Sequence, residues 1–283
     1  MSERKTQTEY FHELKGFRTY LIRERREENT VESYMFTMWN FFSQYDEINE
    51  RNLKLFKLDL MERRSPRTVN LRIAAVNQYL KFTNRDYMKL SGVSIQGKSF
   101  LQNVISTADY MFLKNSLLED GDMDGYFTIW LLGATGARVS EIVRLKVEHV
   151  QSGIFEVYGK GNKMRNIYIP KALKYALLKW LWEQKRDKGY LFAGAAAGKN
   201  GGHITTRAIY ERLQVVGRRY DIDKRVMHPH AFRHFFGKNF IINYPDISLL
   251  SDLMGHSNIE TTRIYTRRSA EEQLGIVNKV VTW

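Results

Sequence analysis

The sequence predicts a mainly α-helical protein with one small β-sheet, divided into two domains. Apolar residues recur at helical spacing through most of the chain. Strand-like runs are confined to residues 154–158 and 165–169. Residues 91–106 have no clear period and contain two glycines, which indicates a linker. We therefore expect an all-helical domain over residues 1–90 and a mixed α/β domain over residues 107–283.

The helices of the first domain are predicted from capping signals and apolar stripes. Asn29 followed by Glu32 resembles a capping box, and Ser65 places a capping side chain before Pro66 at a first helical position. Apolar residues then repeat every three or four positions, which favours a buried core over a binding surface. These stripes contain Tyr10, Leu14, Phe17 and Leu21, then Val31, Tyr34, Met35, Met38, Phe42 and Tyr45, and finally Val69, Ile73, Val76 and Leu80.

The pattern changes from about residue 107. A largely apolar segment, residues 126–132, runs into Gly-Ala-Thr-Gly, and a new helix is expected near Arg138. The two strand-like runs are joined by Gly-Lys-Gly-Asn, a sequence typical of a hairpin turn, so Lys160 lies at a flexible tip. Further helices are expected at residues 171–187, 205–219, 229–243 and 246–254.

Composition limits the classes of function. The chain has 44 Lys and Arg residues against 31 Asp and Glu residues, a net charge of +13. This excess favours a polyanionic partner, although charge alone leaves a merely basic soluble protein open. The absence of cysteine excludes a disulfide framework and cysteine-ligated zinc. No apolar stretch of about 18 residues and no signal-peptide-like start are evident, so we expect a cytoplasmic protein with no membrane partner.

Four short motifs supply the side chains needed to attack a phosphodiester. In chain order they provide two arginines, a lysine, two histidines and a tyrosine. Arginine forks match phosphate oxygens, lysine and histidine move protons, and tyrosine serves as a covalent nucleophile. This inventory needs no metal and no cofactor. The motifs are Ala-Arg-Val-Ser-Glu at 137–141, Gly-Lys-Gly-Asn-Lys at 159–163, His-Ala-Phe-Arg-His at 230–234, and the segment 253–266 with its Gly-His and Tyr265.

The order and spacing of these motifs resemble those of the tyrosine recombinase family, the phage-integrase-type site-specific recombinases. The resemblance covers nearly the whole second domain and includes a Gly-His whose histidine stands nine residues before Tyr265. It implies that Arg138 and Arg233 hold the non-bridging oxygens of the scissile phosphate. It also implies that Tyr265 attacks phosphorus and leaves a 3′-phosphotyrosyl link with a free 5′-hydroxyl.

The resemblance assigns the remaining catalytic roles to one lysine and two histidines. Lys160 is expected to protonate the leaving 5′-oxygen, with Lys163 as the alternative. His230 is expected to accept or relay the proton of Tyr265. His256 is expected to hydrogen-bond the phosphate.

Three neighbours of these residues have other expected roles. Glu141 is expected to orient Arg138 or cap its helix. His228 precedes Pro229 and is expected before the helix rather than on it. His234 points about 100° away from Arg233 by helical geometry, so we interpret it as a buried structural histidine.

By resemblance, the first domain is the core-binding domain, which together with the catalytic domain forms a C-shaped clamp around double-stranded DNA. Phosphate contacts would position the protein, and only a few side chains would contact bases. A solvated basic face is the alternative for each of them. The candidate DNA-binding residues here are Arg63, Arg64, Arg67, Arg72, Lys81 and Arg85, and Lys163 is the candidate in the second domain.

The C-terminal segment, residues 269–283, predicts one more helix. Ser269 and Glu272 resemble a capping box. A short terminal helix is marginal alone, so its apolar stripe must dock in a groove. The resemblance places that groove on a neighbouring protomer in a homotetramer bound to inverted-repeat core sites, and the alternative is docking on its own domain. The stripe contains Leu274, Val277, Val280, Val281 and Trp283.

The predicted function is therefore site-specific DNA recombination. A non-catalytic DNA-binding scaffold and a type IB topoisomerase-like enzyme are the alternatives. Integration, excision, inversion and resolution, including exchange by mobile elements, all use the same core. Because the core-binding helices begin almost at once, with no preceding arm-binding domain, we expect simple exchange at short sites.

Overall fold

The chain forms two compact units, residues 1–97 and 98–283, each with its own apolar core. The division between them falls within the predicted linker. The structure, a computed structural model, describes residues 7–95, 103–158, 164–193, 202–256, 258–267 and 270–281.

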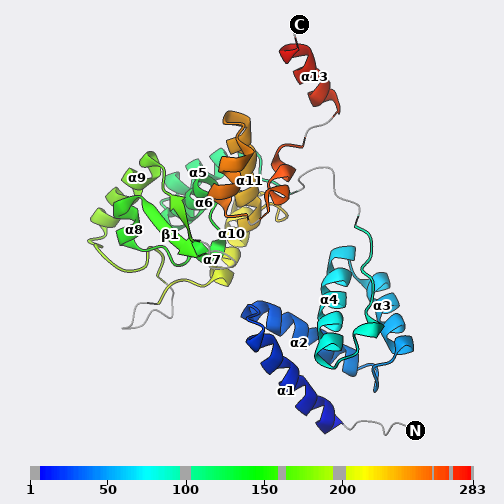
Figure 1. Cartoon of the computed structure of the whole chain (residues 1–283). Coiled ribbons are helices and arrows are strands. Elements are labelled where there is room, and N and C mark those ends of the chain that lie inside the picture. Colours follow the sequence, from blue (N-terminus) through cyan, green and yellow to red (C-terminus); the bar gives the residue numbers. More distant parts are fainter. Residues whose placement is uncertain are drawn as a thin grey trace. The chain divides into compact units, whose positions relative to one another are not determined.

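The first unit is helical, as predicted (Figure 1). Its helices pack around aromatic residues. Phe17 and Tyr79 meet edge to face at 5.1 Å between ring centroids, and Phe41 and Phe56 do so at 5.2 Å. Such pairs add to the free energy gained by burying the rings. The side chain of Tyr10 lies outside the described residues. The elements are α1 (Gln7–Arg23), α2 (Glu28–Phe42), α3 (Glu50–Arg63), α4 (Pro66–Phe82) and the short 3₁₀ helix η1 (Asp86–Met88).

One predicted helix start is confirmed and another is wrong. Ser65 caps α4, where its hydroxyl accepts a hydrogen bond from the Thr68 amide at 3.4 Å. The capping box at Asn29 does not form, because α2 already begins at Glu28 without a side-chain cap. Glu32 instead contacts Arg18 on α1 at 3.0 Å. The left-handed turn at Arg25 (φ 55°) directs the chain into α2 before Asn29 is reached.

The second unit is built around α6, which is apolar on nearly all sides and packs against α5, α9, α10 and α11. The predicted apolar segment 126–132 is the middle of this helix. The elements are α5 (Thr107–Glu119), α6 (Met123–Thr135), α7 (Val139–Ile142), α8 (Val147–Ser152), β1 (Ile154–Tyr158), β2 (Met164–Tyr168), α9 (Lys171–Glu183), α10 (Thr206–Arg219), α11 (Pro229–Asn243), α12 (Ile247–Met254), the 3₁₀ helices η2 (Ile259–Thr261) and η3 (Arg263–Tyr265), and α13 (Ala270–Val280).

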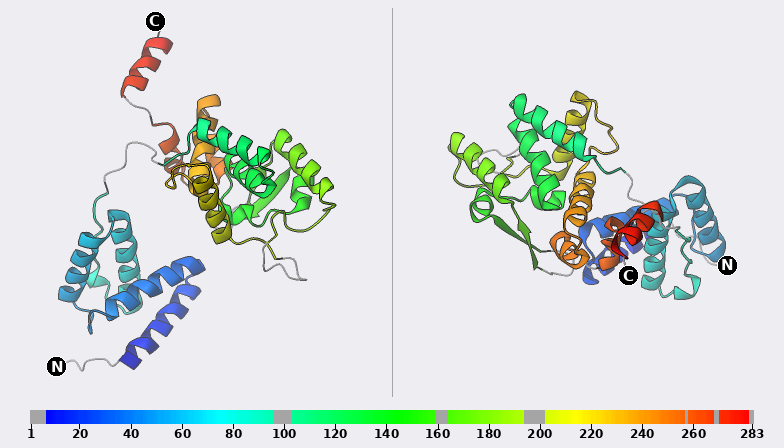
Figure 2. Two further views of the ribbon diagram at one scale, coloured as in Figure 1. Left: turned by 180° about the vertical axis from the view of Figure 1, so that it is seen from behind. Right: turned by 90° about the horizontal axis from the view of Figure 1, so that it is seen from above.

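Within the described ranges, β1 and β2 form the one sheet, an antiparallel pair that Figure 2 shows from two further sides (green). Ile154 pairs with Tyr168 and Tyr158 pairs with Met164, so the second strand begins one residue before its predicted start. Phe155, on one face of the pair, packs into the core. The predicted turn 159–163, with Lys160 and Lys163, lies outside the described residues.

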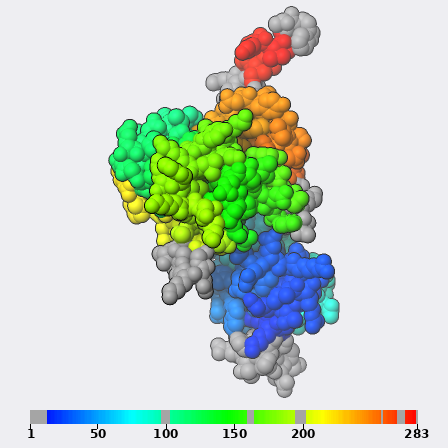
Figure 3. Space-filling model, turned by 90° about the vertical axis from the view of Figure 1, so that its left-hand side faces the viewer, coloured from blue at the N-terminus to red at the C-terminus, as the bar shows by residue number. Residues whose placement is uncertain are grey.

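The helix α12 packs beside β2, and the space-filling view shows the orange and green segments as one continuous surface (Figure 3). The helix α12 ends at Gly255, which adopts the left-handed conformation (φ 61°), as predicted.

The α13 helix is present, and the described residues of its apolar stripe are exposed. The capping side chain of Ser269 and the stripe residue Trp283 lie outside the described residues. Among the described helices, none is long and apolar enough to cross a membrane.

Candidate active site

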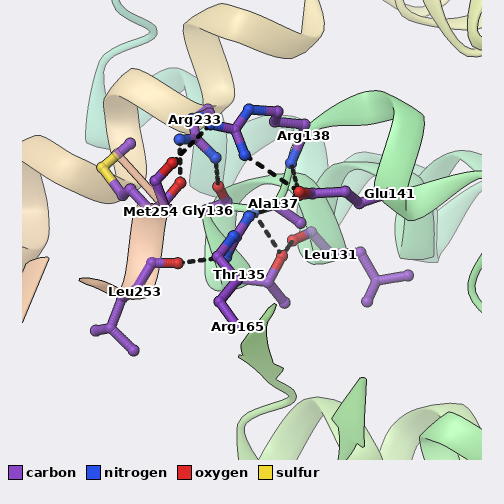
Figure 4. A network of polar contacts seen from close by, with 11 residues as sticks. Leu131, Thr135, Gly136, Ala137, Arg138, Glu141, Arg165, Arg233, Leu253 and Met254 are labelled. Atoms are coloured by element: carbon purple, nitrogen blue, oxygen red, sulfur yellow. Dashed lines mark hydrogen bonds and ion pairs between the residues drawn. The ribbon is translucent and has the colours of Figure 1, made fainter. Parts of the chain in front are cut away.

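A tight turn between α6 and α7 positions Arg138. Gly136 ends α6 in the left-handed conformation (φ 62°), and a Cβ atom there would collide with the ring of Phe236. The turn leaves Arg138 as the N-cap of α7. Glu141 accepts a hydrogen bond from the Arg138 amide at 2.6 Å and another from its Nη1 at 3.2 Å (Figure 4). The expectation that Glu141 orients Arg138 and caps its helix is confirmed.

The other end of Arg138 reaches the C-terminus of α12, where its Nη2 donates to the Gly255 carbonyl at 2.9 Å. Its side chain keeps 39 % of its surface exposed. The guanidinium is therefore held on two sides and remains accessible to a ligand on a third.

Arg233 is the buried partner of Arg138, with only 4 % of its surface exposed. It lies on α11, and its Nη1 donates to the Gly136 carbonyl at 2.6 Å. Its Nη2 donates to the Met254 carbonyl. Both acceptors lie at helix C-termini, where unpaired carbonyls carry partial negative charge. Two helix ends therefore hold the cation in place of a carboxylate.

Arg165 on β2 completes the cluster, and the sequence analysis missed it. Its Nη2 contacts Glu141 at 2.7 Å, its Nη1 donates to the Leu253 carbonyl, and its buried Nε has no hydrogen-bond partner. The sequence does contain an indication that Arg165 is buried, because strand alternation puts it on the same face as the buried Ile167. An arginine on a buried face indicates a fixed partner.

The positive charges of the cluster repel one another. Burial, together with the charges of Arg138 and Arg165, lowers the pKa of Arg233 to about 10. Glu141 contacts both Arg138 and Arg165, and Arg233 relies on carbonyls. An anion placed beside the exposed part of Arg138 would relieve this repulsion. Among the described residues, no group of three or more acidic or histidine side chains is arranged to hold a metal ion.

Tyr265 packs against α11 with 7 % of its surface exposed. The close approach requires Gly237, since a Cβ atom there would lie 2.7 Å from the Tyr265 ring. Burial raises the pKa of Tyr265 to about 12, against the opposing effect of Arg233. The hydroxyl is therefore neutral in this state, and it lies 2.9 Å from Nδ1 of His234.

This contact gives His234, which we interpreted as a buried structural histidine, a partner that the sequence did not indicate. The helical geometry does turn it away from Arg233, but Tyr265 packs on that other side of α11. His234 and His230 stand four residues apart and share a face, with their ring centroids 4.3 Å apart.

The two remaining histidines lie at helix ends. His228 is the N-cap of α11, as expected, and its Nδ1 accepts a hydrogen bond from the Ala231 amide at 3.2 Å. His256 follows Gly255, and its Nδ1 lies 2.8 Å from the hydroxyl of the buried Thr262. Burial and the nearby arginines lower the pKa of His256 to about 4, so its ring is neutral at pH 7.

The structure thus places Arg138, Arg233, His256 and Tyr265 around one site, with His230 beside it through His234. The basic candidates of the first unit differ in exposure. Arg72 donates to the Thr37 hydroxyl at 2.9 Å and lies over Phe36, and Arg85 donates to the Ile48 carbonyl at 3.5 Å. The exposed candidates are Arg63, Arg64, Arg67 and Lys81.

Known proteins resemble both the region of this site and nearly the whole chain. The model of the phage integrase family matches residues 107–272. The tyrosine recombinase XerA of Pyrococcus furiosus is 30 % identical over 264 residues, which cover 91 % of this chain and 90 % of that protein. The tyrosine recombinase XerC of Pseudomonas aeruginosa is 35 % identical over 141 residues, covering 48 % of this chain and 45 % of that protein.

Two solved structures share the fold. The XerH recombinase bound to its difH substrate has a TM-score of 0.71 and 18 % identity, covering 100 % of this chain and 90 % of that one. The Tn1549 transposon integrase with circular intermediate DNA has a TM-score of 0.72 and 17 % identity, covering 95 % and 99 %. Together the matches define a tyrosine site-specific recombinase. The chain belongs to the phage integrase family.

The Glu141 network predicts a stability effect. Glu141→Gln removes the charge that balances Arg138 and Arg165 in a mostly buried setting, so the free energy of unfolding should fall by about 3 kcal/mol. Urea denaturation measures this loss. The control is Glu183→Gln, because Glu183 forms an exposed pair with Lys179 at 3.9 Å and should lose less than about 0.5 kcal/mol. Equal losses in the two variants would contradict the role of Glu141.

Proposed function

We propose that this recombinase cleaves and rejoins DNA through a 3′-phosphotyrosyl link on Tyr265. The proposal rests on the position of the Tyr265 hydroxyl, which lies against α11. The same helix contains Arg233. Attack on phosphorus would keep the free energy of the phosphodiester in the new link. Rejoining to another strand would therefore need no ATP.

Arg138 and Arg233 are proposed to hold the two non-bridging oxygens of the scissile phosphate. These oxygens gain charge in the transition state, and fixed guanidinium donors stabilise that state more than the ground state. Their fixation by Glu141 and the helix-end carbonyls supports this role. His256 is proposed to add a hydrogen bond to the same phosphate.

Proton transfer is assigned to two groups. Lys160 is proposed to protonate the leaving 5′-oxygen, with Lys163 as the alternative, because an alkoxide is a poor leaving group. His230 is proposed to accept or relay the proton that Tyr265 loses, and its ring contact with His234 supports this assignment.

The partner is proposed to be double-stranded DNA with inverted-repeat core sites, bound by the core-binding unit and by the catalytic unit. The net charge of +13 and the exposed basic residues of α3 and α4 support a DNA partner. XerH and the Tn1549 integrase, which share the fold, were solved on DNA. We propose simple exchange at short sites in the cytoplasm, at the nucleoid.

Assembly is proposed to be a homotetramer joined through α13. The described stripe residues Leu274, Val277, Val280 and Val281 have 45 to 61 % of their surface exposed. A helix this short is marginal alone in water, and the exposed stripe supports docking on a neighbouring protomer.

The first test concerns the nucleophile. Tyr265→Phe removes one oxygen, so DNA binding should be unchanged while the covalent adduct disappears. Protein is mixed with a nicked suicide substrate and run on a denaturing gel, where the adduct migrates more slowly. Tyr244→Phe, a change at an exposed tyrosine, is the matched control and should retain the adduct. An adduct that survives Tyr265→Phe would exclude the assignment, and a wild-type protein that binds DNA without any adduct would favour a non-catalytic scaffold.

A second test concerns the acid. Sulfur at the bridging 5′ position makes a leaving group that hardly needs a proton. Lys160→Ala should therefore lose roughly 10²-fold or more in cleavage rate on normal DNA and recover on the sulfur substrate, whereas Arg138→Ala should recover far less. Single-turnover cleavage measures both. If Lys163→Ala and not Lys160→Ala recovered cleavage on the sulfur substrate, the general acid would be Lys163.

A third test concerns the tail. Deleting residues 270–283 should leave a folded protein that binds a half-site but loses cooperative assembly and strand exchange. Leu274→Ser combined with Val277→Ser should act in the same direction, while Asn278→Ser, a polar change on the same helix, should not. Gel-shift and recombination assays report both steps. Normal tetramer formation and exchange by the truncated protein would show that the tail packs only locally.

A further inference from the structure

His234 is the group at hydrogen-bond distance from the proposed nucleophile. Its Nδ1 lies 2.9 Å from the Tyr265 hydroxyl oxygen, and the two ring centroids are 5.6 Å apart. This is the distance at which a base removes a proton directly.

The packing around the pair fixes this contact. Gly237 stands one turn after His234 on α11 and lets the Tyr265 ring lie against the helix. Tyr265 is nearly inaccessible to water and His234 is half-buried. A phenol that must lose its proton in such a setting is served best by a protein base, because little of the Tyr265 surface is open to water.

We propose that His234 takes the Tyr265 proton as the tyrosine attacks the phosphate, and returns it when the strand is rejoined. The inference rests on the proposed function of Tyr265. In cleavage, a bond forms between the Tyr265 oxygen and phosphorus, and the phenolic proton moves to the Nδ1 lone pair of His234. The bond from phosphorus to the 5′-oxygen breaks, and that oxygen leaves with its electron pair and takes a proton from Lys160. Rejoining reverses each transfer.

The surroundings of His234 keep it available as a base. Burial, then His230, Arg233, His228 and His256, lower its pKa to about 4, so the ring is neutral at pH 7. A base this weak is poorly matched to a phenol. A DNA phosphate beside the arginines would add negative charge and raise the pKa of His234. The strength of the base therefore depends on bound DNA.

His230 has a distinct part in this scheme. Its ring lies 4.3 Å from that of His234, four residues earlier on α11. It is placed to pass the proton onward from His234. The proposal makes His234 the first acceptor and His230 the second group in line.

The discriminating variant is His234→Asn. Its Oδ1 can take the place of Nδ1 and accept the hydrogen bond from Tyr265, but an amide does not accept the proton. If His234 only positions the phenol, this variant should cleave normally. If His234 is the base, single-turnover cleavage of the suicide substrate should fall by roughly 10²-fold or more, with half-site binding unchanged. The defect should persist with sulfur at the bridging 5′ position, because that substrate relieves only the need for an acid.

A second measurement separates proton transfer from structural damage. Replacing Tyr265 by 3,5-difluorotyrosine makes the phenol more acidic and reduces its need for a base. The ratio of the His234→Asn rate to the wild-type rate should then rise by about tenfold. A distorted site would not respond to phenol acidity.

The matched control is His149→Asn on α8. Its Nδ1 also accepts a hydrogen bond, from the Lys146 amide at 3.1 Å, and it is also half-buried. It should cleave at the wild-type rate. Cleavage by His234→Asn within about threefold of wild type, or a rate ratio unaffected by fluorination, would overturn the proposal. Absence of an adduct in the wild-type protein would instead refute the proposed function, so the two failures are distinguishable.

Discussion

The site depends on one buried cation bridging two helix ends. Arg233 on α11 donates to the last turns of α6 and α12, at Gly136 and Met254. This contact fixes where α12 ends, and therefore where the Gly255 and His256 turn lies. Because α11 also carries His234 and packs against Tyr265, a shift of Arg233 would displace both the groups proposed to bind phosphate and those proposed to transfer protons.

Such an arrangement trades stability for function. Three guanidinium groups lie close together, and the pKa of Arg233 is lowered by burial and by its neighbours. The one described carboxylate in contact with the cluster, Glu141, is shared between Arg138 and Arg165. Protein interiors ordinarily exclude such an excess of like charge. Such an excess of positive charge suits a site that binds an anion, and local departures from stability rules are expected at functional sites.

Many of the helices and strands could be predicted from the sequence, because they depend on local patterns. The start of α11 follows from Pro229 at a first helical position, and β1 follows from strand alternation. The contact of His234 with Tyr265 was missed because helical geometry was applied relative to Arg233 alone. The same geometry relative to His230, four residues earlier, would have placed both histidines on one face. Arg165 was missed because its partners come from α7 and α12, far away in sequence. The roles of Lys160 and the basic residues of α3 and α4 stay predictions.

The central claim is that the arginine cluster acts by neutralising phosphate charge, and a neutral scissile group tests it most directly. A methylphosphonate at the cleavage position replaces one charged oxygen with a methyl group, so less cationic stabilisation is needed. Cleavage by Arg138→Ala is measured on both substrates and compared with Lys160→Ala. The account predicts that Arg138→Ala regains activity on the methylphosphonate while Lys160→Ala does not. Equal inactivity of Arg138→Ala on both substrates would contradict it.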